Sequence, residues 1–229
     1  MVFSSTIFLF LFLPIFIGIY FLFPAKFRNF ILLLFSLLFY TWGENKLVLL
    51  LLASCVIDYI CGISIENGWR KFGLAMSIIF NLSILGVFKY LNFTFDNFHF
   101  VLALLNIQND FTTNIPRITL PLGISFYTFQ TMSYTIDVYR GHVKASRHFI
   151  QFATYVTMFP QLVAGPIVRY SDISRQLISR TTSINKFNSG VERFIIGMMK
   201  KVLIANTFAL VADSIFEQCM SSDKTELFD

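Results

Sequence analysis

Charged residues are scarce in this chain. Asp, Glu, Lys and Arg make up only 14% of its 229 residues, whereas 55% are hydrophobic. A soluble domain is usually about one-quarter charged. The mean hydropathy of +0.66 and the 29 phenylalanines agree with this deficit. The composition therefore predicts an integral membrane protein rather than a soluble domain.

The motifs of familiar catalytic and metal sites are also lacking. The sequence has three cysteines but no Cys-x-x-Cys pair, which argues against a zinc site or a disulfide framework. His99, His142 and His148 lie in expected loops or at their edges, with no Ser or Cys at a recognisable spacing. No HExxH motif, P-loop, GxSxG motif or Rossmann fingerprint occurs. We therefore expect neither a metal nor a bound cofactor.

Long apolar runs dominate what is present. A helical span needs about 20 apolar residues, and backbone in lipid must satisfy its own hydrogen bonds, which favours helices. The runs cover 7–23, 28–42, 46–64, 72–90, 118–138 and 149–168, and a seventh begins near 191. They are continuous rather than alternating, so a β-barrel is excluded. The sequence predicts an all-α polytopic membrane protein with roughly six spans plus one re-entrant or broken segment.

The positive charges predict how these runs are oriented. Eleven of the 18 lysines and arginines lie in four proposed inside loops, and three lie in the proposed outside segments. The inside loops are 24–29, 63–71, 140–148 and 167–190, and the outside segments are 1–6, 43–46, 92–117 and 217–229. By the positive-inside rule the N-terminus is outside. The net charge of +5 is then a topology signal, and no nucleic-acid partner is expected.

The sixth run is broken within the stretch "MFPQLVAGPIVRYSDI" at 158–173. Pro160, Gly165 and Pro166 are helix-breaking residues. Basic loops flank the run on both sides, so it should enter and leave the membrane on one side or lie along the interface. Irregular backbone at membrane depth survives only when it is buried in protein or lines a wet cavity. Residues 158–169 should therefore face the interior of a helix bundle.

Polar residues inside the other runs form a second feature. Tyr127, Gln130, Tyr134 and Asp137 are spaced to form one stripe on a helix. Such a stripe faces a bundle interior or a water-filled cavity, and hydrogen bonding between helices is the alternative explanation. Asp58 lies in another apolar run without an evident partner.

The seventh run carries two adjacent lysines, Lys200 and Lys201. We expect an amphipathic segment, 187–201, along the inner surface and a short span from about 202. The two lysines then extend to the lipid headgroups.

Three ordered motifs resemble a known family. They are "LPLGISFYTFQTMSYTIDVYRG" at 120–141, "FPQLVAGPIVRY" at 159–170 and "FIIGMMKKVLIAN" at 194–206, in which Asn206 replaces a common Asp. Together they are similar to the membrane-bound O-acyltransferase (MBOAT) family, in particular its bacterial alginate O-acetyltransferase-like branch. The resemblance covers essentially the whole chain.

The resemblance implies a fold and an activity. The fold is a ring of helices around a thinned membrane core, crossed by a tunnel, in the bacterial cytoplasmic (inner) membrane. An acyl group, acetyl in this branch, passes from a cytoplasmic thioester such as acetyl-CoA to a hydroxyl of a cell-surface or secreted polysaccharide. Membrane lipids and separate extracytoplasmic acetyl-transfer proteins are implied partners. The tunnel candidates are Tyr127, Gln130, Tyr134, Asp137, Gln161 and Arg169.

One departure concerns catalysis. The family's catalytic histidine, a general base, lies in the second half of its members, and no position here matches it. We therefore expect residues 1–229 to form the N-terminal portion of a single transmembrane domain, with that histidine beyond Asp229. The chain alone should be inactive.

Two other functions fit the pattern less well. A transporter or channel could place a substrate path at the broken residues 158–169, because transporters use broken helices at mid-membrane. An internal repeat would support that reading, and none is evident between the halves of the chain. A scaffolding membrane protein without chemistry would not need the polar stripe.

Overall fold

The computed structural model describes residues 3–44, 47–104, 119–162, 165 and 168–226. These residues form helices and loops and contain no strand. The chain divides into two compact units: Leu13–Arg180, and a second unit that combines Val2–Phe12 with Thr181–Asp229. The expected all-helical architecture is confirmed for this part of the chain.

The first unit begins with two apolar helices, α1 (Leu13–Leu22) and α2 (Arg28–Gly43). Pro14 is the second residue of α1, which follows directly on the π-helical turn Phe8–Phe12. The proline therefore lies inside a continuous helical stretch and removes one of its hydrogen-bond donors. α2 begins at Arg28, and the largely exposed Trp42 lies near its C-terminal end. This arrangement suits a helix that ends at the membrane interface, where Trp is enriched.

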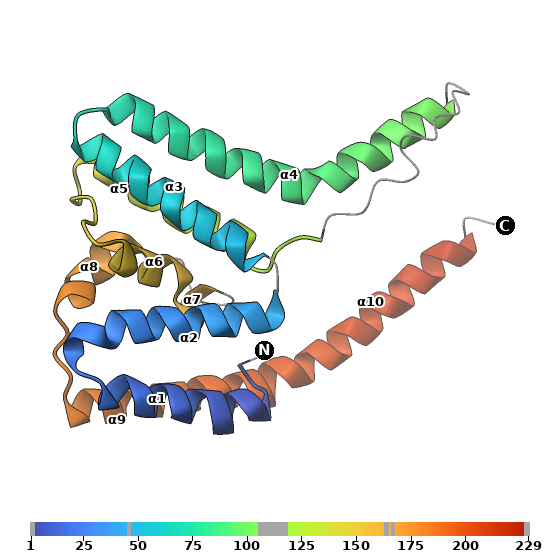
Figure 1. Ribbon diagram of the computed structural model, residues 1–229. Coiled ribbons are helices and arrows are strands. Elements are labelled where there is room, and N and C mark those ends of the chain that lie inside the picture. The colour runs from blue at the N-terminus through green and yellow to red at the C-terminus, as the bar shows by residue number, and fades with distance from the viewer. Residues whose placement is uncertain (1–2, 45–46, 105–118, 163–164, 166–167, 227–229) are drawn as a thin grey trace. The chain divides into compact units, whose positions relative to one another are not determined.

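Three helices pack side by side in the next part of the unit: α3 (Val48–Glu66), α4 (Arg70–Leu104) and α5 (Ile124–Arg140) (Figure 1). α4 has 35 residues and does not end near residue 90, where the apolar run ends. The expected loop from residue 92 is therefore wrong as far as residue 104. The physical reason is that no glycine or proline follows Gly86 until Pro116. The rest of that expected segment, 105–117, lies outside the described residues.

The sixth apolar run does not form one span. It gives α6 (Phe149–Thr157), a break at Met158 and a short α7 (Phe159–Leu162). α8 (Tyr170–Ile178) follows. Nine residues of α6 measure about 13 Å at the helical rise, too little to cross a hydrocarbon core of about 30 Å. The predicted break is confirmed at Met158 and Pro160, whereas Pro166 lies outside the described residues.

Helices α6 and α7 pack against α2, and α6 also contacts α3, α5 and α8 (Figure 1). Aromatic side chains fill the centre of this arrangement. The Tyr134 ring lies 4.5 Å from that of Phe152 and 5.0 Å from that of Tyr170, and the Tyr155 and Tyr170 rings are 5.2 Å apart. Cys55 and Cys61 are buried free thiols in the same unit.

The second unit contains α9 (Ile184–Met199), a π-helical turn (Lys200–Ala205) and α10 (Asn206–Glu226). The helix continues through both lysines, and the expected surface segment 187–201 followed by a short span from about 202 stays a prediction. The backbone at these lysines changes from α-helical to π-helical hydrogen bonding over Lys200–Ala205 without interrupting the helix.

Among the described residues, three helical stretches are long and apolar enough to cross a membrane: Val48–Glu66, Arg70–Leu102 and Ile184–Met220. Phe8–Leu22 is a shorter apolar stretch. These stretches support a multi-pass membrane protein.

Candidate functional site

The polar stripe on α5 is buried in the helix packing. Tyr127 and Tyr134 are fully buried, and Gln130 and Asp137 nearly so. Gln130 Nε2 donates a hydrogen bond to the Tyr155 carbonyl at 2.8 Å. The stripe therefore faces the bundle interior, as its spacing predicted.

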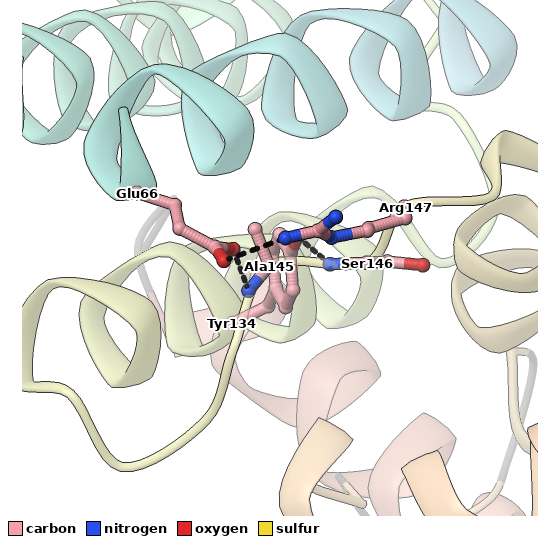
Figure 2. A network of polar contacts seen from close by, with 5 residues as sticks. All are labelled: Glu66, Tyr134, Ala145, Ser146 and Arg147. Carbon is pink, nitrogen blue, oxygen red and sulfur yellow. Dashed lines mark hydrogen bonds and ion pairs between the residues drawn. The ribbon is translucent and has the colours of Figure 1, made fainter. Parts of the chain in front are cut away.

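Tyr134 contributes to a polar network at one end of the unit, drawn in Figure 2. Its hydroxyl accepts a hydrogen bond of 3.0 Å from the Ser146 N–H. Glu66, at the end of α3, accepts 2.8 Å from the Ala145 N–H and lies 3.8 Å from Arg147. Together these contacts fix the basic loop 141–148 against α3 and α5. Sequence reasoning missed Glu66. Nothing in the sequence indicated that this acidic residue would contact the basic loop 141–148.

Asp137 and Tyr127, at the two ends of the stripe, differ in whether their polar groups have partners within the protein. Asp137 Oδ1 lies 3.5 Å from Nδ1 of the exposed His142. The Tyr127 hydroxyl and the neighbouring Thr128 hydroxyl are buried with no hydrogen-bond partner among the described residues. The stripe is thus partly explained by contacts within the protein, and its role in a tunnel stays a prediction.

Asp58 finds neutral partners rather than a cation. Ser77 Oγ donates to its Oδ1 at 2.5 Å, and Asn81 Nδ2 donates to both oxygens at 3.0 and 2.9 Å. Thr131 and Thr135 of α5 extend the network, at 3.2 Å from Asn81 Oδ1 and 2.9 Å from Ser77 Oγ. All five side chains are buried. The network joins α3, α4 and α5 and satisfies the buried carboxylate.

The broken segment is held to the rest of the unit by specific contacts. The Tyr155 hydroxyl donates to the Val168 carbonyl at 3.0 Å, and the Phe159 N–H donates to Ser36 Oγ at 3.2 Å. Gly123, which precedes α5, has a φ of 75°, and a Cβ there would lie 2.8 Å from the Leu162 carbonyl oxygen. A glycine is needed at position 123 because the backbone there has a left-handed conformation and because the Leu162 backbone approaches it closely.

A pocket of about 370 Å³ opens beside this segment. Its lining residues come from α2, the broken segment and α8: Leu32, Met158, Pro160, Gln161, Gly165, Val168, Ile173, Gln176, Leu177 and Arg180. Buried within it is Gln161 Nε2, which has no hydrogen-bond partner among the described residues. We call this space the Gln161 pocket. Its volume lies within the range of about 300–1,000 Å³ typical of small-molecule sites.

The structure brings only one of the six candidates to this pocket. The α5 stripe does not line it, and neither does Arg169, which is exposed and precedes α8 as its N-cap residue. Gln176 and Arg180 do line it, and sequence reasoning did not single them out. Gln176 lies in α8 and Arg180 lies just beyond its end, both after the motif that ends at Tyr170.

The histidines do not form a catalytic cluster in the described part of the chain. His142 and His148 are exposed, and the side chain of His99 lies outside the described residues. No group of three or more His, Cys, Asp and Glu side chains that could hold a metal ion occurs among the described residues.

Comparisons with a family model and with curated proteins agree in matching this chain to O-acyltransferases. Residues 32–227 match the model of the membrane-bound O-acyltransferase family. The chain is 42% identical over 221 residues to a protein of Pseudomonas syringae pv. tomato, and equally to one of Azotobacter vinelandii, both named "Probable alginate O-acetylase AlgI". It is 32% identical over 258 residues to the "Peptidoglycan O-acetyltransferase" of Helicobacter pylori.

The matches cover 94% of this chain for the first two relatives and 96% for the third. They cover only 42%, 44% and 47% of the relatives themselves. The chain therefore spans less than half the length of these curated relatives. No solved structure is significantly similar to it.

Proposed function

Because this chain belongs to the membrane-bound O-acyltransferase family, we propose that the whole protein transfers an acyl group to a hydroxyl of a cell-surface or secreted polysaccharide. The acyl group is acetyl, as the names of the alginate and peptidoglycan relatives suggest. Family membership also favours this activity over the transporter or channel that broken residues 158–169 could otherwise indicate.

The observation that carries the proposal to particular residues is the unpaired amide of Gln161. A buried N–H donor without a partner costs about 1–3 kcal/mol, so it is expected to serve a ligand or a bound water. Gln161 Nε2 lies at a pocket beside a broken segment, where irregular backbone surrounds a space large enough for a substrate. We assign this pocket as part of the substrate path.

The chemistry of acyl transfer indicates what such an amide does. A bond forms between the acceptor oxygen and the acyl carbon, the carbon–sulfur bond of the thioester breaks, and the hydroxyl proton passes to a base. The acyl carbonyl oxygen gains negative charge on the way, and a fixed N–H donor stabilises that charge. Gln161 Nε2 is the donor in our proposal.

The base is not assigned to this chain. His142 and His148 are exposed side chains outside the lining of the Gln161 pocket. We therefore propose that residues 1–229 are the N-terminal portion of one transmembrane domain and do not turn over alone. The other tunnel candidates, Tyr127, Gln130, Tyr134, Asp137 and Arg169, are positioning residues for the path in the same proposal.

The finer topology and partners belong to the same proposal. The chain contributes roughly six spans and one re-entrant segment to a helical ring in the cytoplasmic membrane, with its N-terminus outside. An acyl thioester such as acetyl-CoA approaches from the cytoplasm, and the polysaccharide acceptor approaches from the opposite side. Extracytoplasmic acetyl-transfer proteins complete the reaction. The excess of Lys and Arg in the proposed inside loops supports this orientation.

Substitution of Gln161 in the full-length protein tests the proposal. Gln161→Ala should lower kcat/KM about 100-fold, the usual cost of losing one donor to a developing oxyanion. Its unfolding midpoint should stay near wild type, because Nε2 has no hydrogen-bond partner to lose among the described residues. Acetyl transfer is measured with purified protein, acetyl-CoA and a polysaccharide acceptor.

Asn97→Ala is the matched control, since this exposed amide bonds only to its own helix. The control should keep wild-type transfer. Full activity of a well-folded Gln161→Ala variant would remove Gln161 from the reaction.

A further inference from the structure

A second pocket lies at the start of α2, where three cations gather. Its volume is about 370 Å³, and its lining includes Lys26, Arg28, Asn29, Gln151 and Arg180 but no acidic residue. None of the three cations forms an ion pair with a described residue. We call this space the headgroup pocket.

The two arginines are held close together around one aromatic ring. The Arg28 guanidinium carbon lies 5.6 Å from the centre of the Tyr20 ring, and that of Arg180 lies 6.0 Å from it. Arg180 also donates to the Tyr20 hydroxyl at 2.6 Å and to Asn29 Oδ1. Asn29 in turn donates to the Leu177 carbonyl at 2.7 Å. Neutral groups therefore fix Arg180 in place without compensating its charge.

Arg28 leaves a donor unused. Its Nε is buried and has no hydrogen-bond partner among the described residues. Three cations line this one pocket without an acidic residue, so their charges repel each other, and the buried unpaired donor adds a further cost. An anion with several acceptor oxygens would relieve both costs, and phosphate groups fit this description because arginine binds them through paired N–H groups.

A third, more apolar pocket adjoins the headgroup pocket. It has a volume of about 580 Å³ and shares Lys26, Asn29 and Gln151 with its neighbour. Phe27, Phe30 and Ile150 line it, and these side chains are 47%, 50% and 43% exposed. A site that continues from cations to exposed apolar side chains matches an amphiphile with an anionic head.

We propose that the headgroup pocket and the apolar pocket together bind one anionic phospholipid. Its phosphate accepts hydrogen bonds from Arg28, Arg180 and Lys26, and an acyl chain lies along Phe27 and Phe30. Basic pockets at the ends of membrane helices bind anionic lipid headgroups in this way. A soluble phosphate ester would use the cations but not the apolar side chains. The inference is independent of the acyl-transfer activity.

Lipid retention by the full-length protein tests the proposal. The protein is purified in neutral detergent and titrated with phosphatidylglycerol or with phosphatidylcholine of the same chains, and bound lipid is counted by native mass spectrometry. Wild type should bind phosphatidylglycerol at least about tenfold more tightly. Each cation contributes about fivefold, so Lys26→Gln/Arg28→Gln should abolish the preference.

The matched control is Lys71→Gln/Lys144→Gln. It removes two exposed cations from predicted inside loops that do not line either pocket, and it should retain the preference. Equal losses in both double variants would show a general charge effect and overturn the site. So would equal binding of the two lipids by wild type.

Two further measurements keep the test decisive. Lys26→Gln alone removes an exposed side chain that has no hydrogen bond or ion pair to the described residues, so the variant should fold normally and lose about fivefold in affinity. Phe30→Ser should weaken phosphatidylglycerol binding as well. If glycerol 3-phosphate displaces the lipid at equal concentration and Phe30→Ser has no effect, the ligand is a soluble phosphate ester and the lipid proposal is wrong.

Discussion

Two buried polar regions of this molecule differ in how completely they are satisfied. In the Asp58 network, the carboxylate receives hydrogen bonds from Ser77 and Asn81, and α5 supplies further hydroxyls. In the Gln161 pocket, the buried amide donor Nε2 of a partly exposed side chain has no partner among the described residues. Both regions interrupt apolar sequence, so hydropathy alone treats them alike.

The difference separates polar residues that hold helices together from those available to a ligand. A satisfied network stabilises the packing of α3, α4 and α5 and has no group left for a substrate. An unsatisfied donor beside a pocket contributes little to folding and can gain a partner on binding. Substitutions in the first region should therefore change stability, and substitutions in the second should change activity.

Removing the centre of the satisfied network should have the largest effect on stability. Asp58→Ala takes two acceptor oxygens from the donors on Ser77 and Asn81, and it should lower the free energy of unfolding by about 3 kcal/mol, since each unsatisfied buried group costs about 1–3 kcal/mol. Denaturant titration of the detergent-solubilised full-length protein, followed by tryptophan fluorescence, measures the change. Asp58→Asn, which keeps the shape and one acceptor, should lose less.

If Asp58→Ala proves as stable as wild type but inactive, the network is functional, and the contrast with the Gln161 pocket fails.

The close approach between α5 and the broken segment should give the next largest effect. Gly123→Ala places a Cβ 2.8 Å from the Leu162 carbonyl oxygen, at a φ of 75°. A left-handed alanine costs about 1–2 kcal/mol, so with the crowding we expect about 2 kcal/mol of destabilisation in the same titration. Gly86→Ala is the control, because nothing lies within 4 Å of the added Cβ. It should be neutral or slightly stabilising.

The smallest expected change in stability comes from two tyrosines of α5, Tyr134 and Tyr127, whose hydroxyl groups can be removed one at a time. Tyr134→Phe leaves the Ser146 N–H without its acceptor and should cost about 1 kcal/mol. Tyr127→Phe removes a hydroxyl with no partner in the described structure and should leave stability unchanged. A loss of transfer activity with Tyr127→Phe would place this hydroxyl on the substrate path. Equal destabilisation by both substitutions would show that the Tyr127 hydroxyl has a structural partner, such as a buried water.

Local sequence signals were sufficient for part of this architecture. Two of the three helix breakers at 158–166, Pro160 and Gly165, lie at or next to the observed interruption, because proline acts on the backbone immediately around it. The α5 stripe faces the interior because one helical period determines which residues share a face. The sequence also singled out Gln161 as a candidate, because it lies in the broken motif itself, but its place in a substrate tunnel stays a prediction.

Other features depend on contacts that no local pattern contains. The partners of Asp58 are Ser77 and Asn81, four residues apart on α4. Residues four apart share one face of a helix, but only the packing of α3 on α4 shows that this face meets Asp58. The pairing of Arg28 with Arg180 joins residues 152 positions apart around Tyr20. Charge counting assigned both arginines to topology and could not bring them together.

The length of α4 sets a limit on where its last turns can lie in a bilayer. Its 35 residues measure about 52 Å, whereas the hydrocarbon layer is about 30 Å thick. To keep its whole length within that layer, α4 would have to tilt by about 55° from the bilayer normal, which is beyond the usual range of about 0–40°. At a tilt of about 40° roughly 26 residues fit in the layer. With Arg70 at one interface, the turns after Asp96 therefore reach the headgroup layer or the water beyond it. The exposed rings of Phe98 and Phe100 then lie at or beyond the edge of the hydrocarbon layer, so this end of α4 presents apolar side chains to the headgroups.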